Sequence, residues 1–158
     1  SPRIEYKCMA IEDFDYTPES YDIVISSLTF HYLESFPDIC KKVHRCLTPG
    51  GAFVFSVEHP VFTAYGSQDW FYDKQRNILH WPVDRYFSEG KREAIFLGEK
   101  VTKFHKTLTT YVNGLIQNGF EITGLVEPEP DKTLLDSIPG MRDELRRPMM
   151  LIISAVKK

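Results

Sequence analysis

The stretch "YDIVISSLTFHYLESFPDICKKVHRCLTPGGAFVFSV" (residues 21–57) decides the fold of this chain. It begins with residues 21–28, an apolar run rich in β-branched side chains that is typical of a strand buried on both faces. A second run of this kind covers residues 52–57. A predicted helix lies between the two runs, so the stretch indicates a βαβ unit with a parallel strand pair and a right-handed connection. We therefore predict an α/β fold with a doubly wound, mostly parallel sheet.

Local signals mark both ends of the predicted helix. Ser35 is placed to cap its N-terminus, Pro37 suits its first turn, and Asp38 occupies the capping-box position. Residues 48–51, "TPGG", end it, because proline cannot continue the hydrogen-bond ladder and glycine tolerates the left-handed conformation of many helix exits. The residues that form its apolar stripe are Ile39, Val43, Cys46 and Leu47.

The rest of the chain alternates between regular and irregular patterns. We expect strands at residues 4–10, 121–128 and 149–156, and a helix within residues 107–120 that ends at Asn118-Gly119. Residues 131–148 contain prolines and are expected to be partly helical.

Residues 60–104 interrupt this order. They hold many aromatic residues among charges, without helical or strand period over most of their length. We expect one domain over residues 1–158 in which residues 60–104 form an aromatic insertion. Two interpretations stay open: a cap that protects the core of the sheet, or a lid that walls a binding pocket.

Composition narrows the functional classes. The chain has 158 residues, of which 42% are hydrophobic and 13% aromatic, so it can bury a substantial core. The net charge of −3 arises from interspersed signs, which argues against nucleic acid or an anionic membrane as a partner. Three cysteines without a C-x-x-C pair fit a reducing cytoplasm, and no apolar run is long enough to span a membrane. Chemistry on a small-molecule substrate is favoured.

Several catalytic motifs are absent from the sequence. There is no G-x-S-x-G nucleophile elbow, no Tyr three residues before a Lys of the kind that short-chain dehydrogenases use, and no G-x-x-x-x-G-K phosphate loop. Cys40 and His44 share a helix face, but no further ligand stands at a suitable spacing, so we predict no metal site.

Three histidines are the catalytic candidates. His31 follows the strand at residues 21–28, and His59 follows the strand at residues 52–57 within the triplet Glu58-His59-Pro60. His105 precedes the late helix. Because ligands bind at the carboxyl ends of parallel strands, His31 and His59 are expected at the site.

The ordered motifs resemble a known family. Residues 1–60 carry "A-x-E-D" after a strand, then "YDIVISS", then a helix, "LTPGG" and a strand. This order resembles the second half of class I S-adenosylmethionine-dependent methyltransferases, in the small-molecule branch that includes enzymes of ubiquinone and menaquinone biosynthesis. Residues 104–130, "FHKTLTTYVNGLIQNGFEITGLVEPEP", are similar to the late helix and strand of that branch.

The resemblance implies a Rossmann-like fold, S-adenosylmethionine as cofactor and methyl transfer to a small molecule. It places adenine against Ala10, Ile11 and Glu12, with Glu12 as the alternative side chain for the adenine amino group because relatives often carry an acid at Ala10. It places the methionine moiety against Ser26, Ser27 and Leu28, with His31 on the acceptor side. Methyl transfer is an in-line displacement whose leaving group needs no proton, so no catalytic triad is required. From the aromatic insertion and the late helix, we expect Tyr65, Trp70 and Tyr111 to bind the acceptor.

The chain also departs from the family. The first strand with its glycine-rich loop, and the acid that holds the ribose hydroxyls, would lie before Ser1. We therefore expect an N-terminally incomplete methyltransferase domain that binds the cofactor weakly or not at all by itself. The alternative is a non-catalytic α/β fragment that acts as an interaction module and forms a homodimer through its exposed sheet edge.

Limited proteolysis tests the assignment of residues 60–104. The first cuts in the unliganded chain should fall within this segment, because few of its residues are predicted to belong to a regular hydrogen-bond ladder. Mass spectrometry of the fragments locates the cuts. First cleavage within residues 21–57 would contradict the predicted arrangement.

Overall fold

The computed structural model describes residues 4–158. Its first half comprises the 3-10 helix η1 (Ile11–Asp13), strand β1 (Tyr21–Ser27), the 3-10 turn η2 (Phe30–Tyr32), helix α1 (Phe36–Cys46), strand β2 (Leu47–Glu58), helix α2 (Pro60–Ala64), and strands β3 (Phe71–Tyr72) and β4 (Ile78–His80). Its second half comprises β5 (Gly90–Phe96), β6 (Glu99–His105), α3 (Leu108–Gln117), β7 (Phe120–Val126), the 3-10 helices η3 (Lys132–Leu134) and η4 (Met141–Arg146), and β8 (Met150–Lys157).

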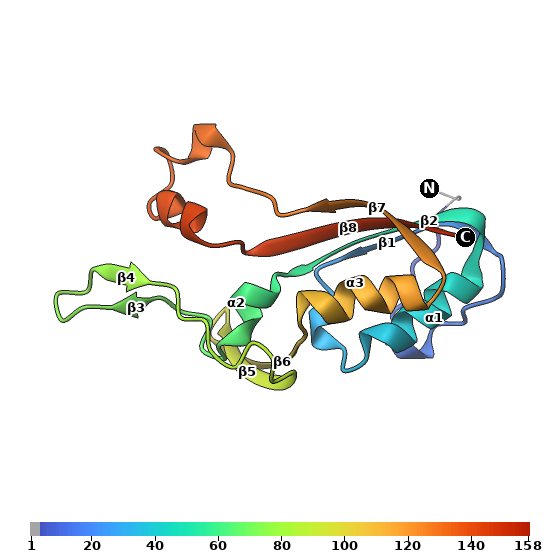
Figure 1. Cartoon of the computed structure of the whole chain (residues 1–158), viewed down its shortest axis with the longest axis horizontal. Helices are drawn as coiled ribbons and strands as arrows, with labels where there is room; N and C mark the ends of the chain where they lie inside the picture. The colour runs from blue at the N-terminus through green and yellow to red at the C-terminus, as the bar shows by residue number, and fades with distance from the viewer. Residues whose placement is uncertain (1–3) are drawn as a thin grey trace.

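The main sheet has four strands in the order β1-β2-β8-β7 (Figure 1). β1 and β2 are parallel and joined through α1, which confirms the predicted βαβ unit. β8 pairs antiparallel with both β2 and β7. Three of the four strands therefore run in one direction, and the last strand of the chain enters between two of them in the opposite direction.

Local contacts define both ends of α1. Ser35 Oγ accepts a hydrogen bond of 3.4 Å from Asp38 N, which confirms the predicted cap. Leu47 already pairs with Tyr21, and a register shift follows before Ala52 pairs with Ile23. Gly51 is needed within this irregularity, since a Cβ there would lie 2.9 Å from the Thr48 carbonyl oxygen.

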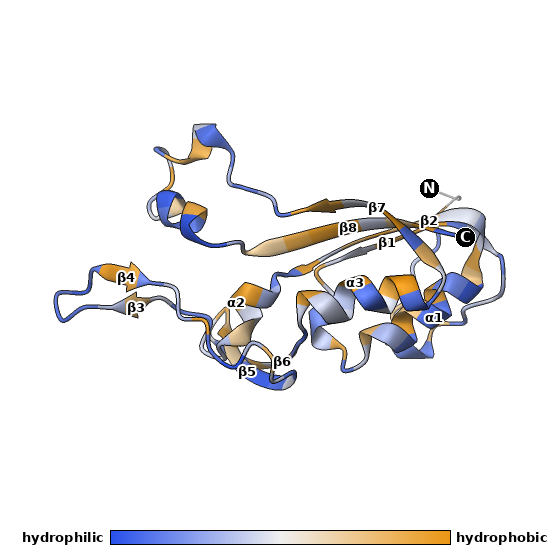
Figure 2. Cartoon of the chain, in the orientation of Figure 1, coloured by the Kyte–Doolittle hydropathy of each residue, from blue (hydrophilic) through white to orange (hydrophobic). Residues whose placement is uncertain are grey.

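Helices α1 and α3 cover one face of the sheet (Figure 1), and the core lies between them and the strands. Figure 2 shows hydrophobic residues along much of β8 and alternating colours on α1 and α3, as expected for helices with one buried face. The largest fully buried side chains of the core are Phe30, Phe36, Val43, Leu47, Phe53, Phe55, Val57, Tyr111, Leu115, Leu151 and Ile153.

The expectation that residues 21–28 are buried on both faces is wrong for the described chain. Ile23 and Ile25 are 52% and 70% exposed, because the helices pack only against the opposite face of β1. Val24, which points to that opposite face, packs against the core.

The strand predicted for residues 4–10 is also wrong over the residues described. They carry no regular structure, and no strand of residues 4–158 pairs with them. Ile4 and Tyr6 are 55% and 86% exposed, so these residues bury no apolar face against the described chain.

Residues 60–104 are more regular than their sequence indicated. They contain α2 and the antiparallel pair β3–β4, and end in β5 and in most of β6. The turn between β5 and β6 places Leu97 and Gly98 at φ 51° and 86°, as in a tight hairpin. Lys91, Arg92 and Glu93 stand at consecutive positions of β5, so no apolar-polar alternation marked this segment as a strand. Among residues 4–158, no helix is long and apolar enough to cross a bilayer.

Gly119 provides a stability test of the α3–β7 connection. Its φ is +83°, and a Cβ there would lie 2.8 Å from His44 Nε2. Gly98 has a similar φ of +86° but open space around it, so it is a matched control. Gly98→Ala should cost about 1–2 kcal/mol of unfolding free energy from backbone strain alone, and Gly119→Ala at least about 1 kcal/mol more from overpacking.

Urea unfolding of the two variants measures this difference. Equal losses in the two variants would contradict the packing of His44 against the turn.

Candidate active site

Polar side chains gather where β1 and β2 end. After β1, Leu28 N donates hydrogen bonds to Ser56 O at 2.9 Å and to Ser56 Oγ at 3.2 Å, which keeps the chain beside β2. The turn η2 then buries Phe30 and His31. Glu58 N, at the end of β2, donates to His31 Nδ1 at 3.2 Å. The two strand ends are thus linked through one imidazole.

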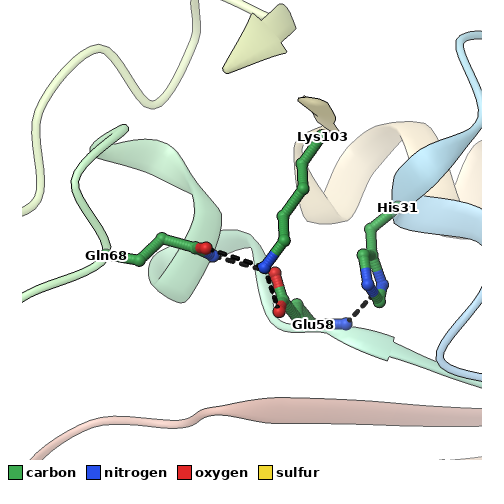
Figure 3. Close-up of polar contacts among 4 residues, drawn as sticks. All are labelled: His31, Glu58, Gln68 and Lys103. Atoms are coloured by element: carbon green, nitrogen blue, oxygen red, sulfur yellow. Dashed lines mark hydrogen bonds and ion pairs between the residues drawn. The ribbon is translucent and has the colours of Figure 1, made fainter. Parts of the chain in front are cut away.

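Three side chains from distant segments close a hydrogen-bonded ring beside His31 (Figure 3). Lys103 Nζ of β6 lies 2.6 Å from Glu58 Oε1 and 2.8 Å from Gln68 Oε1. Gln68 Nε2 donates to Glu58 Oε2 at 2.8 Å. The side chains of Lys103 and Glu58 are only 3% and 10% exposed, so the ion pair is almost completely desolvated.

His31 is neutral near pH 7 in this environment. Burial lowers its pKa from 6.5 to about 4, and the charges of Lys103 and Lys106 lower it while Glu58 raises it. Because Nδ1 accepts from Glu58 N, the proton of the neutral ring is on Nε2. His31 therefore presents a hydrogen-bond donor at this edge.

Lys106 holds the turn that carries His31. Its Nζ donates to the carbonyl oxygens of Phe30 at 3.4 Å, Leu33 at 2.5 Å and Phe104 at 3.2 Å. Burial lowers the pKa of Lys106 to about 8, partly offset by Glu89 and Glu34. The ammonium thus stabilises the backbone at the start of η2 and just after its end.

A groove of about 420 Å³ runs along β1 between η1 and α1. Its lining combines apolar side chains, such as Phe14 and Val24, with the hydroxyl-bearing residues Ser26 and Ser27. η1 is held beside α1, since Lys42 Nζ donates to Glu12 O at 3.0 Å. The groove ends at Thr29 and Phe30, which lead into the turn that carries His31.

A second cavity of about 470 Å³ lies at the carboxyl side of the sheet. Met149 and Met150 line it where β8 begins, and Met150 is the register partner of Glu58. The other segments around it are residues 128–130, residues 139–141, residues 143–144, and Trp70 and Ile78 of the insertion. Within residues 4–158, no group of three or more His, Cys, Asp or Glu side chains is arranged to hold a metal ion.

Comparisons with known proteins place this geometry in a family. A family model of a methyltransferase domain matches residues 1–55. A crystal structure of a Listeria monocytogenes protein assigned to the S-adenosylmethionine-dependent methyltransferases is 56% identical, with a TM-score of 0.94. That match covers 100% of this chain and 71% of the Listeria chain. The chain belongs to the S-adenosylmethionine-dependent methyltransferase family.

Two further relatives were found, one of which is a methyltransferase of known structure. A Mesorhizobium loti S-adenosylmethionine-dependent methyltransferase of known structure is 37% identical, with a TM-score of 0.86 over 96% of this chain and 69% of its own. A curated Haemophilus influenzae protein of uncharacterised function is 31% identical over 163 residues. The present chain spans 62% of the length of that protein.

The cofactor residues predicted for the methyltransferase are placed close together, but not all line the groove. Ile11, Ser26 and Ser27 do. Ala10 is the N-cap of η1, Glu12 is exposed with its carbonyl oxygen bound to Lys42, and Leu28 turns the chain at φ 52° beside Ser56. These six assignments stay predictions.

His59 and His105 are buried, and in the described chain their side chains form hydrogen bonds with groups other than Glu58, Gln68 and Lys103. His59 caps α2, with Nδ1 accepting from Val61 N at 3.0 Å, and its Nε2 lies 2.8 Å from Glu127 Oε1 outside hydrogen-bonding alignment. His105 Nδ1 and Nε2 each lie 2.8 Å from an oxygen, of Thr63 and Tyr86 respectively. Burial lowers the pKa of both histidines. These contacts favour structural roles, and of the three candidates only His31 joins the polar cluster.

The three residues predicted to bind the acceptor lie in different environments. Trp70 lines the cavity of about 470 Å³. Tyr65 is 41% exposed and does not line that cavity. Tyr111 is 1% exposed and packs against Phe36 with ring centroids 4.8 Å apart, because it lies on the apolar face of α3. The structure thus places Tyr111 in the core, which contradicts a role in acceptor binding.

The sequence reasoning missed Gln68, Lys103 and Lys106. Glu58 was noticed only as part of a triplet. Lys103 lies 45 positions from Glu58, and nothing in the charged segment around it marked its inward orientation. The period-two alternation of a strand is the one signal in the sequence that could have placed Lys103 on the same face of β6 as His105.

The lowered pKa of His31 predicts a pH dependence of stability. Between about pH 4 and about 6.5 the unfolded state binds the proton that the folded state excludes, so stability is lost as pH falls through this window. His31→Asn keeps an acceptor near the Nδ1 position but cannot titrate, so it should reduce this loss, leaving the part that His59 and His105 contribute through their own lowered pKa values.

Urea unfolding at about pH 7 and about pH 5 compares the two proteins. His80→Asn, at an exposed position, is the matched control and should keep the wild-type slope. The same slope in His31→Asn as in the wild type would show that His31 does not carry the effect.

Proposed function

We propose that the protein containing this chain transfers the methyl group of S-adenosylmethionine to a small-molecule acceptor. The observation that carries the proposal is the groove along β1, which leads at Thr29 and Phe30 into the turn bearing His31. Membership of the methyltransferase family supports it, as do relatives of known structure whose names refer to S-adenosylmethionine. Because the chain is shorter than these relatives, the activity is proposed for the full-length protein.

The lining of the groove suits an adenosyl group. Ile11, Phe14 and Val24 offer apolar surface to a flat ring, and Ser26 and Ser27 offer hydroxyl groups for hydrogen bonds. The bound cofactor would supply an activated methyl group on a sulfonium. Residues of this chain would hold it and exclude water.

We assign the side of the site that faces the methyl acceptor to the polar cluster formed by His31, Glu58, Gln68 and Lys103. Catalysis of methyl transfer depends mainly on alignment of the nucleophile with the methyl group. In this proposal His31 donates a hydrogen bond from Nε2, and Glu58 accepts one from the acceptor. Lys103 and Gln68 fix the direction of the Glu58 carboxylate, because each binds one of its oxygens.

A second candidate function rests on the edge of β1. No strand within residues 4–158 pairs with its outer edge, and Tyr21, Ile23 and Ile25 are exposed beside it. An unpaired edge with apolar side chains favours pairing with another chain. Under this candidate the chain is an interaction module that forms a homodimer, and sedimentation equilibrium would show a dimer that the variant Ile25→Lys abolishes.

Cofactor binding distinguishes the two candidates. Titration calorimetry of the full-length protein with S-adenosylhomocysteine should show binding. Ser26→Phe, which fills the groove, should weaken it at least about tenfold. Ser88→Phe, at an exposed turn outside the groove, is the matched control and should bind like the wild type.

Absence of binding in the wild type, or equal affinity in Ser26→Phe, would contradict the assigned groove. A circular dichroism spectrum and unfolding midpoint like those of the wild type would show that Ser26→Phe remains folded.

A further inference from the structure

The cavity of about 470 Å³ is built by two segments that are far apart in the sequence. The insertion after β2 contributes Trp70 and Ile78, and the connection between β7 and β8 contributes Pro128, Met141 and Met149. The floor adjoins the proposed acceptor side, since Met150 pairs with Glu58 and His59 N donates to Met149 O at 2.8 Å. This volume is in the range of small-molecule sites.

The walls favour an apolar ligand. Trp70 and Ile78 form one side, and three methionines, three prolines and a glycine contribute much of the remainder. Methionine side chains are flexible and polarisable, so they adapt to varied apolar surfaces.

The charged residues of the cavity lining are all acidic, although arginines pair with two of them from outside the lining. Its charged lining residues are Glu129, Asp143 and Glu144, and no lysine, arginine or histidine lines it. Asp143 pairs with Arg146 at 3.0 Å and Glu144 with Arg147 at 2.7 Å. Glu129 forms no ion pair or hydrogen bond within the part of the chain that the structure describes. An anionic ligand would therefore find no unpaired cation in the described lining, whereas a cationic ligand would find the unpaired carboxylate of Glu129.

Arg147 joins the two walls. Its guanidinium lies 4.3 Å from the ring centroid of Trp81 and 5.1 Å from that of Trp70, and it binds both carboxylate oxygens of Glu144. Trp70 and Glu144 both line the cavity, and Arg147 is buried behind them. The cation–π and ionic contacts of one side chain thus fix the distance between the insertion and the β7–β8 connection.

We propose that this cavity binds the methyl acceptor, and that the acceptor is an apolar molecule bearing a basic nitrogen, with its ammonium at Glu129. The claim that the bound molecule is the methyl acceptor rests on the proposed function. The claim that the cavity binds an apolar amine rests on the volume of the cavity, its apolar walls and its acidic lining.

A series of probes with one apolar body and three head groups tests the inference. We would titrate the full-length protein with 4-phenylbutylamine, 4-phenylbutanol and 4-phenylbutyrate by calorimetry. The amine should bind at least about tenfold more tightly than the carboxylate, with the alcohol between them. Met141→Trp, which fills the cavity, should abolish binding of the amine.

The variant Glu129→Gln tests the contribution of the carboxylate charge, because it removes the charge at nearly constant side-chain size. It should remove most of the preference for the amine while leaving the affinity for the alcohol unchanged. Glu99→Gln, at an exposed position in the β5–β6 hairpin outside the cavity, is the matched control and should keep the preference. Equal binding of the amine and the carboxylate, or an unchanged preference in Glu129→Gln, would overturn the inference.

S-adenosylhomocysteine binding in the same samples separates the two claims. A protein that binds this cofactor analogue but does not prefer the amine retains the proposed function and loses the inference. A protein that prefers the amine but does not bind the analogue loses the proposed function and, with it, the acceptor role of the cavity.

Discussion

The buried ion pair between Glu58 and Lys103 is the contact on which the architecture of the candidate site depends. Two charges separated by 2.6 Å and removed from water lose much of their hydration, and their attraction compensates for this only when further hydrogen bonds satisfy them. Gln68 supplies those bonds, one to each partner. The end of β2, the loop after α2 and strand β6 are therefore fixed relative to one another.

Residues at the end of β6 also fix the other segments at the carboxyl edge of the sheet. Two residues after Lys103, His105 binds Thr63 of α2, and Lys106 then binds the carbonyl oxygens at the start of η2 and just after its end. The strand thus connects the insertion, the short helix after β2 and the turn that presents His31. Burial of His31 within these contacts keeps its ring neutral near pH 7, so its Nε2 carries the proton and can only donate a hydrogen bond.

Local and periodic features of the structure could be predicted from the sequence. The strands and helix of residues 21–57, the Ser35 cap and the late helix depend on neighbouring residues, and the position of His31 follows from the rule that ligands gather at carboxyl ends of strands. The Glu58–Lys103 pair depends on a hairpin whose many charged residues resemble those of a solvated surface. Tyr111 was misassigned because an aromatic residue on an apolar helix face looks the same whether it lines a core or a pocket. His59 stands at a strand end, as a catalytic residue would, yet its contacts are those of a helix cap.

The most direct test of the account is a double-mutant cycle on Glu58 and Lys103, measured by urea unfolding. Lys103→Met leaves a buried carboxylate without its cation and should cost about 3–5 kcal/mol. The double variant Glu58→Gln/Lys103→Met should be more stable than the sum of the single losses indicates, with a coupling energy of about 2 kcal/mol or more. Losses that add within about 0.5 kcal/mol would show that the two residues act independently and would contradict the central role of the pair.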